Sequence, residues 1–197
     1  PATASRGGSW SAATWPPRSA TARYGRDVRI SVVVPCFDYE RFVGEAIDSV
    51  LAGTRTPDEV IVVDDGSTDR SADVASAREG VTVVRKENGG MASAVNRGIV
   101  ESTGDVVVLL DADDLADAAR IAWVEQAFAD PEVVMAWHPL VIRDERGAEH
   151  GCCPSGHLPG GDLVPGILAD CLTSFAVTSG IAVRRSALDA VGPIPED

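Results

Sequence analysis

Short apolar runs alternate with helical repeats along most of the chain. The run ISVVVP at 30–35 is rich in β-branched residues and ends in Pro35, which has no amide hydrogen for a central ladder. It therefore predicts a strand that stops at this proline. Apolar residues between Phe42 and Leu51 then recur every three or four positions, which predicts a helix with Asp38 as its N-cap.

The same order of strand and helix is repeated towards residue 114. The segments are a strand, turn and helix from EVIVVDDGSTD at 59–69 to about Ala77, a strand in VTVVRK at 81–86, a loop and helix over 88–102, and a strand in DVVVLLDADD at 105–114. Strands that alternate with helices of this length pair in parallel through right-handed crossovers. We therefore expect an α/β fold, a doubly wound layer with a mostly parallel central sheet and helices on both faces. Ligands of such sheets bind at the carboxyl ends of the strands.

The segments outside this core are less regular. We expect a flexible N-terminal extension over 1–28, a helix at about 117–129 and a strand over 132–143 that is bent or broken at Pro139. A loop rich in glycine and proline follows over 144–165. The last predicted elements are a strand and a helix over 179–192, with Ser186 as N-cap and Gly192 as helix stop. Docking of Trp10 and Trp15 onto the domain is the alternative to a flexible extension. In either case, we expect residues 29–197 to form a single domain.

The charge of the chain excludes one class of partner. Hydrophobic residues make up 45% of its 197 positions, enough for the core of one domain, and the net charge is −13. Such an acidic protein repels nucleic acid and anionic membranes.

No apolar run approaches the roughly 20 residues that cross a bilayer, so we expect no transmembrane segment. The four cysteines form no C-x-x-C pair, which favours reduced thiols in a cytoplasmic protein. Attachment to the periphery of a membrane is a separate possibility that the sequence leaves open.

Three carboxylates close the strand that ends near residue 114. In VVLLDADD, Asp111, Asp113 and Asp114 follow a run of apolar residues, and carboxylates this close repel one another. A D-x-D at a strand end suits a hard divalent cation, because Mg²⁺ and Mn²⁺ prefer carboxylate oxygens. Asp111 and Asp113 would lie on the same side of an extended chain. The alternative is a solvated turn before a helix.

A second acidic pair ends an earlier strand. Asp64 and Asp65 precede Gly66, which permits a tight turn, and Ser67, which we expect to begin a helix whose N-terminus favours an anion. A carboxylate at this place can accept hydrogen bonds from the N–H or hydroxyl groups of a nucleoside. Taken alone, the pair is also compatible with an ordinary turn between a strand and a helix.

Four segments follow one another in the chain: VVVPCFDYERFVGEAIDSVL, EVIVVDDGSTDRS, NGGMASAVNRGI and GDVVVLLDADD. In order and spacing they resemble the nucleotide-binding half of the inverting glycosyltransferases of family two, which have the GT-A fold. The resemblance covers about residues 30–128 and, more faintly, 179–197. It implies transfer of a sugar, with inversion, from a nucleotide-diphosphate sugar to a glycan, lipid or small-molecule acceptor. It also implies Mn or Mg as the cofactor and UDP as the commonest nucleotide.

The resemblance also implies roles for individual residues by their position. In the first loop, Pro35, Phe37 and Asp38 would contact the base and ribose. Asp64, with Asp65 beside it, would accept a hydrogen bond from the base, and Asn88, Gly89 and Asn96 would lie beneath the diphosphate. Asp111 and Ala112 would lie near the ribose, with Asp113 and Asp111 as the metal ligands.

The chain departs from the family pattern in several places. Ala118 and Ala119 replace a common proline and acidic residue before Arg120, and Val95 stands where an arginine is frequent. RRSALDAVGPIPED resembles the segment that precedes the catalytic base, so the base and part of the acceptor half would follow Asp197. The alternative is that Asp197 is itself the base.

Other interpretations stay open at this stage. A chain without its base would be a non-catalytic nucleotide-sugar-binding module. A Mg-dependent phosphohydrolase fits less well, because that chemistry generally needs a nucleophilic aspartate after the first strand, where this chain has Pro35 and Cys36. His138, His150 and His157 have no standard zinc spacing, and we expect them at the surface.

Overall fold

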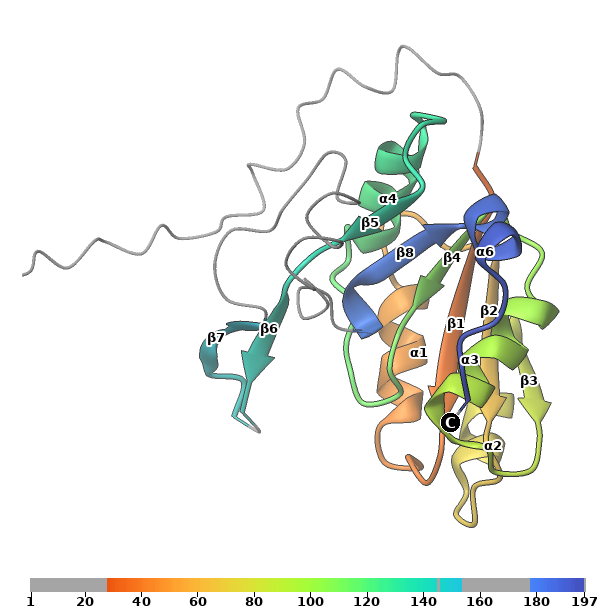
Figure 1. The fold of residues 1–197 in the computed structure, drawn as a ribbon. Helices are drawn as coiled ribbons and strands as arrows, with labels where there is room; N and C mark the ends of the chain where they lie inside the picture. The colour runs from red at the N-terminus through yellow and green to blue at the C-terminus, as the bar shows by residue number, and fades with distance from the viewer. Residues whose placement is uncertain (1–27, 145, 154–177, 197) are drawn as a thin grey trace, which may run out of the picture.

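The computed structural model describes residues 28–144, 146–153 and 178–196 (Figure 1). Several predicted features lie outside these ranges: the N-terminal extension except for its last residue, most of the loop over 144–165, His157 and Asp197. The elements of the described residues are, in chain order, β1 (Ile30–Cys36), α1 (Val43–Leu51), β2 (Glu59–Asp64), α2 (Ser71–Ser76), β3 (Val81–Arg85), α3 (Gly90–Glu101), β4 (Val106–Leu109), α4 (Arg120–Phe128), β5 (Met135–Trp137), β6 (Leu140–Arg143), β7 (Glu149–Cys153), the 3₁₀ turn η1 (Thr178–Gly180), β8 (Ile181–Arg184) and α6 (Arg185–Val191).

A six-stranded sheet forms the centre of the described part of the chain, in the order β3-β2-β1-β4-β8-β5. The first four strands in this order are parallel, and β8 and β5 continue the sheet with antiparallel pairing. β1 lies between β2 and β4, and every residue of β1 is buried. The predicted α/β fold with a mostly parallel sheet is therefore confirmed.

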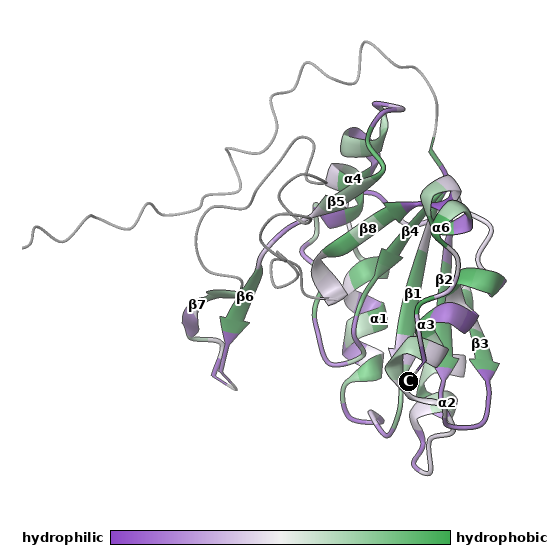
Figure 2. Cartoon of the chain, viewed as in Figure 1, coloured by the Kyte–Doolittle hydropathy of each residue, from purple (hydrophilic) through white to green (hydrophobic). Residues whose placement is uncertain are grey.

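Helices cover both faces of the sheet, as predicted. On one face, Ile47 of α1 and Phe128 of α4 belong to the same buried cluster as Val32 of β1. On the other face, Val95 of α3 is buried with Val33 of β1. Neighbouring residues of β1 point to opposite faces of the sheet because side chains alternate along a strand. Figure 2 shows the hydrophobic residues concentrated in the strands between the helices.

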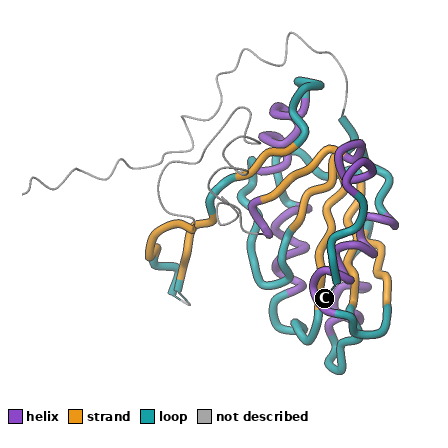
Figure 3. Tube along the Cα trace, viewed as in Figure 1, coloured by secondary structure: helices purple, strands orange, loops and turns teal. Residues whose placement is uncertain are grey.

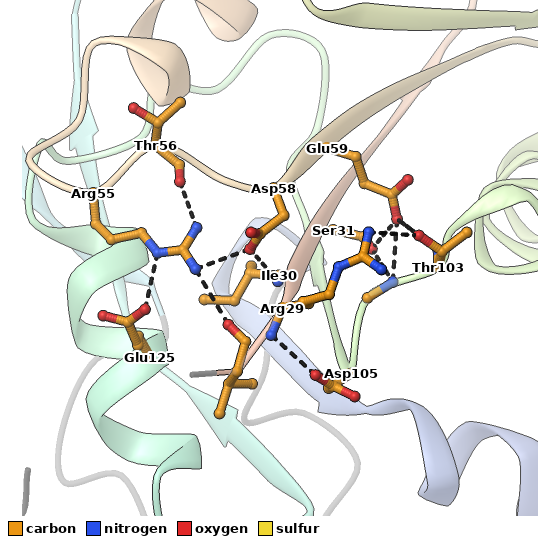
Figure 4. A network of polar contacts seen from close by, with 12 residues as sticks. Arg29, Ile30, Ser31, Arg55, Thr56, Asp58, Glu59, Thr103, Asp105 and Glu125 are labelled. Carbon is orange, nitrogen blue, oxygen red and sulfur yellow. Dashed lines mark hydrogen bonds and ion pairs between the residues drawn. The ribbon is translucent and has the colours of Figure 1, made fainter. Parts of the chain in front are cut away.

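Polar side chains hold the amino ends of the strands together (Figure 4). Glu59, at the start of β2, accepts hydrogen bonds from the hydroxyl group of Ser31 and from the backbone N–H of Thr103. The backbone N–H of Ile30 donates to Asp58 Oδ2 at 2.8 Å. Because these contacts lie at the starts of β1, β2 and β4, they align the strands and leave the opposite, carboxyl ends free to carry loops.

A separate hairpin corrects the expected loop over 144–165. β6 and β7 pair in a two-stranded antiparallel sheet, which lies apart from the main sheet in Figure 3. His138 and Pro139 separate β5 from β6, so the predicted break at this proline is confirmed. Among the described residues, no helix is both long and apolar enough to cross a membrane.

Three predicted helix starts are wrong. Asp38 has a φ of 57° and caps no helix, and its carboxylate instead accepts a hydrogen bond from the backbone N–H of Thr68 at 2.7 Å. Ser67 lies in a loop, because α2 begins only at Ser71. Ser186 lies inside α6, which begins one residue earlier, whereas the predicted stop at Gly192 is confirmed by its φ of 87°.

Candidate functional site

The carboxyl ends of β1, β2 and β3 lie level with one another. Cys36 of β1 is paired with Asp64 of β2, and Asp64 is paired with Arg85 of β3. On the other side of β1, the backbone N–H of Leu110 donates to the carbonyl of Val33 at 3.0 Å. The loops that follow these strands therefore meet at one edge of the sheet, the lower edge in Figure 1. The predicted site residues of the four loops are brought to this edge.

Asp64 lies at this edge with one carboxylate oxygen only weakly held by the protein. The residue is only 3% exposed, and its Oδ1 accepts a hydrogen bond from the backbone N–H of Ser67 at 3.1 Å. Its Oδ2 lies 3.5 Å from Nε of Arg85, a side chain that is 64% exposed. An exposed arginine at this distance holds the carboxylate weakly, so Asp64 can accept a further hydrogen bond from a ligand.

Asp65 has a different, structural arrangement. Its Oδ1 lies 2.6 Å from Nζ of Lys86, and it accepts hydrogen bonds from the backbone N–H groups of Gly89 and, at 2.8 Å, Gly90. Both oxygens are thus occupied by groups of the third loop, at the start of α3. Asp65 therefore shapes the loop that carries Asn88 and Gly89, and the neighbouring acidic residues have separate tasks.

The second and third loops touch at Gly66. This residue has a φ of 81°, and a β-carbon added to it would lie 2.9 Å from the backbone nitrogen of Asn88. A side chain at this position would meet backbone, which cannot move aside cheaply, in addition to the strain of the positive φ. Glycine is therefore required here by both conformation and space, and Asn88 itself stays exposed.

The first loop is tied to the second by reciprocal hydrogen bonds. The backbone N–H of Asp38 donates to the hydroxyl oxygen of Ser67 at 3.0 Å, while Asp38 Oδ1 accepts from the backbone N–H of Thr68. Phe37 is 42% exposed beside them. Pro35 is buried within β1 opposite Val63, so it supports the loop from beneath.

The D-x-D segment forms a turn, which corrects the expected extended chain. The backbone N–H of Asp114 donates to the carbonyl of Asp111 at 3.1 Å, and the N–H of Asp111 donates to the hydroxyl oxygen of Ser179 at 2.7 Å. Asp113 is exposed, whereas Ala112 is 1% exposed and belongs to the core. We call residues 111–114 the acidic turn.

Repulsion between carboxylates contributes to the pKa shifts at this turn. Burial raises the pKa of Asp111, a hydrogen bond from Ser179 opposes the shift, and the charges of Asp114 and Asp113 add to it, with a net rise. The charge of Asp113 is the largest cause that raises the pKa of Tyr39, followed by burial and by the charge of Asp111. The phenol of Tyr39 therefore lies within the field of the acidic turn. A cation at the turn would relieve this repulsion.

The acidic turn fits a cation only with help from other ligands. No group of three or more His, Cys, Asp or Glu side chains within residues 28–144, 146–153 and 178–196 is arranged to hold a metal ion. Mg²⁺ commonly binds through one or two carboxylates together with water and substrate phosphates. Asp113 and Asp111 can supply that small carboxylate set, so these two residues fit a metal that arrives with a phosphorylated ligand.

Asn96 contacts the C-terminal segment of the chain. Its Nδ2 donates to the carbonyl of Ile194 and to Glu196 Oε1, each at 2.8 Å, and its Oδ1 accepts from the N–H of Ile194 at 2.8 Å. Figure 1 shows the segment after α6, in dark blue, running along α3 towards the carboxyl edge of the sheet. The amide of Asn96 is thus engaged within the protein. The expected place of Asn96 beneath a diphosphate stays a prediction.

Several residues of the site were not assigned a role from the sequence. Lys86 is the last residue of the strand predicted over 81–86, and a charged residue at a strand end is a signal that sequence reasoning can use. Ser179 lies far from the acidic turn in the sequence, so no local pattern indicated its contact with Asp111. His138 corrects the expectation of a surface histidine, because its Nε2 is buried. His150 is exposed as expected, and its ring contacts Asp144 at 3.0 Å.

Comparison with curated proteins identifies relatives over most of the chain. Residues 31–192 match the family model described as glycosyl transferase family 2. An uncharacterised glycosyltransferase of Nostoc sp. is 36% identical over 177 residues, which cover 85% of this chain and 54% of that protein. The uncharacterised glycosyltransferase EpsJ of Bacillus subtilis is 37% identical over 94 residues, covering 46% of this chain and 27% of EpsJ. The chain thus spans about half, or less, of the length of these relatives.

Solved structures share the fold. The mannosyltransferase PcManGT from Pyrobaculum calidifontis, in complex with GDP-Man and Mn²⁺, has a TM-score of 0.65 at 24% identity and covers 88% of this chain and 49% of its own. S. aureus TarS in complex with UDP-GlcNAc has a TM-score of 0.61 at 20% identity, with 85% and 48% covered. Glucosyl-3-phosphoglycerate synthase from Mycobacterium tuberculosis, with Mn²⁺, UDP and phosphoglyceric acid, has a TM-score of 0.56 at 25% identity, with 86% and 58% covered. The predicted GT-A fold is confirmed.

Proposed function

Because the chain belongs to glycosyl transferase family 2, we propose that the carboxyl edge of its sheet binds a nucleotide-diphosphate sugar and contributes to transfer of the sugar to an acceptor with inversion. The observation that carries this proposal is the convergence of Asp64, the exposed third loop and the acidic turn at one edge. These groups offer a hydrogen-bond acceptor for a base and carboxylates for a cation. Solved structures of the same fold contain GDP-Man with Mn²⁺, or UDP with Mn²⁺, which supports a nucleotide and a divalent cation here.

Each residue has a role in this proposal that follows from its exposure and contacts. The available oxygen of Asp64 accepts a hydrogen bond from the base, which we propose is uracil. Phe37 and Asp38 border the base and ribose from the first loop, and Asn88 borders the diphosphate from the third. Buried residues support these loops without direct contact: Pro35, Asp65, Asn96 and Ala112. Gly89 is exposed, its backbone N–H is held by Asp65, and it borders the diphosphate beside Asn88.

Asp113 and Asp111 would hold Mn²⁺ or Mg²⁺ in this proposal. Such an ion neutralises negative charge on a departing diphosphate. Asp113 presents its carboxylate at the surface of the acidic turn, while Ser179 and the turn hydrogen bond hold the backbone of Asp111. Inversion needs a general base on the face of the sugar opposite the diphosphate. Asp197 is our candidate from the sequence and lies outside the described residues.

The proposal is tested by calorimetric titration of the protein with UDP, GDP and dTDP, each with and without Mn²⁺. We expect UDP to bind and Mn²⁺ to strengthen its binding. In the variant Asp113→Ala, Mn²⁺ should no longer strengthen UDP binding, a loss of at least about tenfold in affinity or about 1.4 kcal/mol. The melting temperature of this variant should be equal or higher, because one repelling charge is removed. The control is Asp189→Ala, an exposed aspartate of α6, which should bind as the parent protein does.

The outcomes separate the competing functions. Unchanged Mn²⁺-dependent affinity in Asp113→Ala contradicts the assignment of the metal ligands, and absence of binding by every nucleotide contradicts the proposed function. Binding of UDP-sugar without hydrolysis or transfer by the full protein indicates a non-catalytic binding module. Release of phosphate from simple phosphate esters would instead favour a phosphohydrolase.

A further inference from the structure

Three buried polar atoms without a hydrogen-bond partner belong to residues near the acidic turn. They are Oδ1 of Asp111, Nε of Arg120 and Nε2 of His138, and no other buried side-chain nitrogen or oxygen of the described residues lacks a partner. Protein interiors leave few such atoms, because an unpaired buried polar group costs about 1–3 kcal/mol. Three of them in neighbouring parts of the fold therefore need a physical explanation.

The sheet brings Asp111 and His138 to opposite sides of η1. Asp111 follows β4, and its backbone N–H donates to the hydroxyl oxygen of Ser179 at 2.7 Å. His138 follows β5, and its backbone N–H donates to the carbonyl of Gly180 at 3.0 Å. Ser179 and Gly180 are consecutive residues that lead into β8, the strand between β4 and β5 (Figure 1). Asp111 and His138 therefore flank the start of β8 on its two sides.

Arg120 places its guanidinium at the end of β4. The residue is 3% exposed, and its Nη2 donates to the carbonyl of Leu109 at 2.7 Å, two residues before Asp111. Burial lowers the pKa of Arg120 to about 10, against the charges of Asp114 and Asp111. Burial also lowers the pKa of His138, and the charge of Arg120 adds to that shift. Arg120 thus interacts electrostatically with both other residues.

The three atoms have complementary hydrogen-bonding characters. His138 Nδ1 lies 3.0 Å from the carbonyl oxygen of Pro139, which can only accept, so Nδ1 carries the hydrogen and Nε2 of the neutral ring is an acceptor. Oδ1 of Asp111 is a second acceptor, and Nε–H of Arg120 is a donor. A water molecule donates two hydrogen bonds and accepts others, so it satisfies this set. A cation would be repelled by Arg120, and an anion by Asp111.

We propose that Asp111, Arg120 and His138 together bind one buried water molecule, through which Arg120 and His138 orient the carboxylate of Asp111 towards the ligand edge. This inference rests on the proposed function, since it describes how one proposed metal ligand is held. Arg120 and His138 are positioning residues, because they act through Asp111 and the water. Partners of this kind around a metal ligand typically change metal affinity about 10–100-fold when they are replaced.

The variant His138→Phe tests the role of His138, because it keeps an aromatic ring and removes the acceptor. We expect the affinity for Mn²⁺, measured with UDP present, to fall about tenfold, while the affinity for UDP without metal stays unchanged. His138→Gln, which retains a polar group, should restore most of the loss. The matched control is His150→Phe on β7, whose side chain is 57% exposed and should have no effect. Equal Mn²⁺ affinity in the parent protein and His138→Phe overturns the positioning role.

A second variant and a crystal structure test the inference if His138→Phe does not fold. Arg120→Lys keeps a positive charge and removes Nε–H, and it should also weaken Mn²⁺ binding with UDP; unchanged binding overturns the role of Arg120. A high-resolution crystal structure of the parent protein should show one water within hydrogen-bond distance of all three atoms. Absence of that water overturns the inference even if nucleotide binds. If no nucleotide binds but the water is present, the proposed function fails and the water site stands.

Discussion

A β-carbon added to Gly98 of α3 would lie 2.2 Å from Cγ1 of Val33 on β1. Gly98 is buried, so α3 approaches the central strand of the sheet more closely than any side chain would permit. This contact sets the distance between α3 and the sheet. It also positions the third loop, since that loop leads directly into α3.

Gly98→Ala should lower the free energy of unfolding by about 1–3 kcal/mol, because an overpacked core must shift backbone or side chains. Alanine is the better helix former by about 1 kcal/mol, so the clash must outweigh that gain. Gly44→Ala in α1 is the matched control, because the three atoms nearest to the added β-carbon there all belong to the guanidinium of Arg78, the end of a flexible side chain that can move. Urea unfolding of both variants measures the difference, and equal losses of stability would contradict the steric explanation.

Asp64 and Asp65 should respond differently to the same substitution. Asp65→Asn removes the charge that pairs with Lys86, whose side chain is 19% exposed, and weakens the hydrogen bonds from Gly89 and Gly90. It should therefore lower stability by about 1–3 kcal/mol. Asp64→Asn should change stability less and weaken UDP binding more. Thermal unfolding and calorimetry test the pair, and the opposite order would show that the roles are exchanged.

Asn96→Ala should release the C-terminal segment from α3. The N–H of Ile194 donates to Asn96 Oδ1, so its hydrogen exchange should be slow in the parent protein and faster in the variant. The lost contacts also free Glu196, whose pKa is lowered first by the hydrogen bond from Asn96 and then by that from Ser93, so this pKa should rise towards its ordinary value. Asn88→Ala, in the exposed third loop, is the control and should leave the exchange of Ile194 unchanged. Slow exchange in Asn96→Ala would be inconsistent with an anchoring role.

The stability of the protein should fall in acid partly through Glu59. Burial raises the pKa of this carboxyl group, but hydrogen bonds from Ser31, Thr103 and Gly104 outweigh it, and the net shift is downward. Its contribution to stability is therefore present above the ordinary pKa of glutamate and is lost as the pH falls through the lowered value in the folded protein.

Measurement of unfolding free energy against pH tests this contribution. Glu59→Gln should be less stable than the parent protein at neutral pH, and the difference should shrink as the pH falls through that range. Ser31→Ala removes one donor and should reduce the pH dependence without abolishing it. Parallel stability curves for the parent protein and Glu59→Gln would exclude Glu59 as a source of acid sensitivity.

Local patterns predicted the central elements because each depends on residues close together in the chain. The β-branched run around Val32 and the helical repeat around Ile47 needed no distant partner to be recognised. The helix starts were less predictable. Asp38 and Ser67 have the side chains of N-caps, but each forms hydrogen bonds to the other loop, and those bonds exist only once the two strand ends lie side by side.

The sequence by itself determined the alternation of strands and helices, the acidic residues at the strand ends and the motifs of the family, because hydrophobic periodicity and short spacings are properties of neighbouring residues. Only the tertiary structure decided the different contacts of Asp64 and Asp65, the contact of Asn96 with Ile194, and the contact of Asp111 with Ser179. These contacts join residues up to 98 positions apart. The order of strands and the close approach of α3 to β1 set them, and no local pattern encodes either.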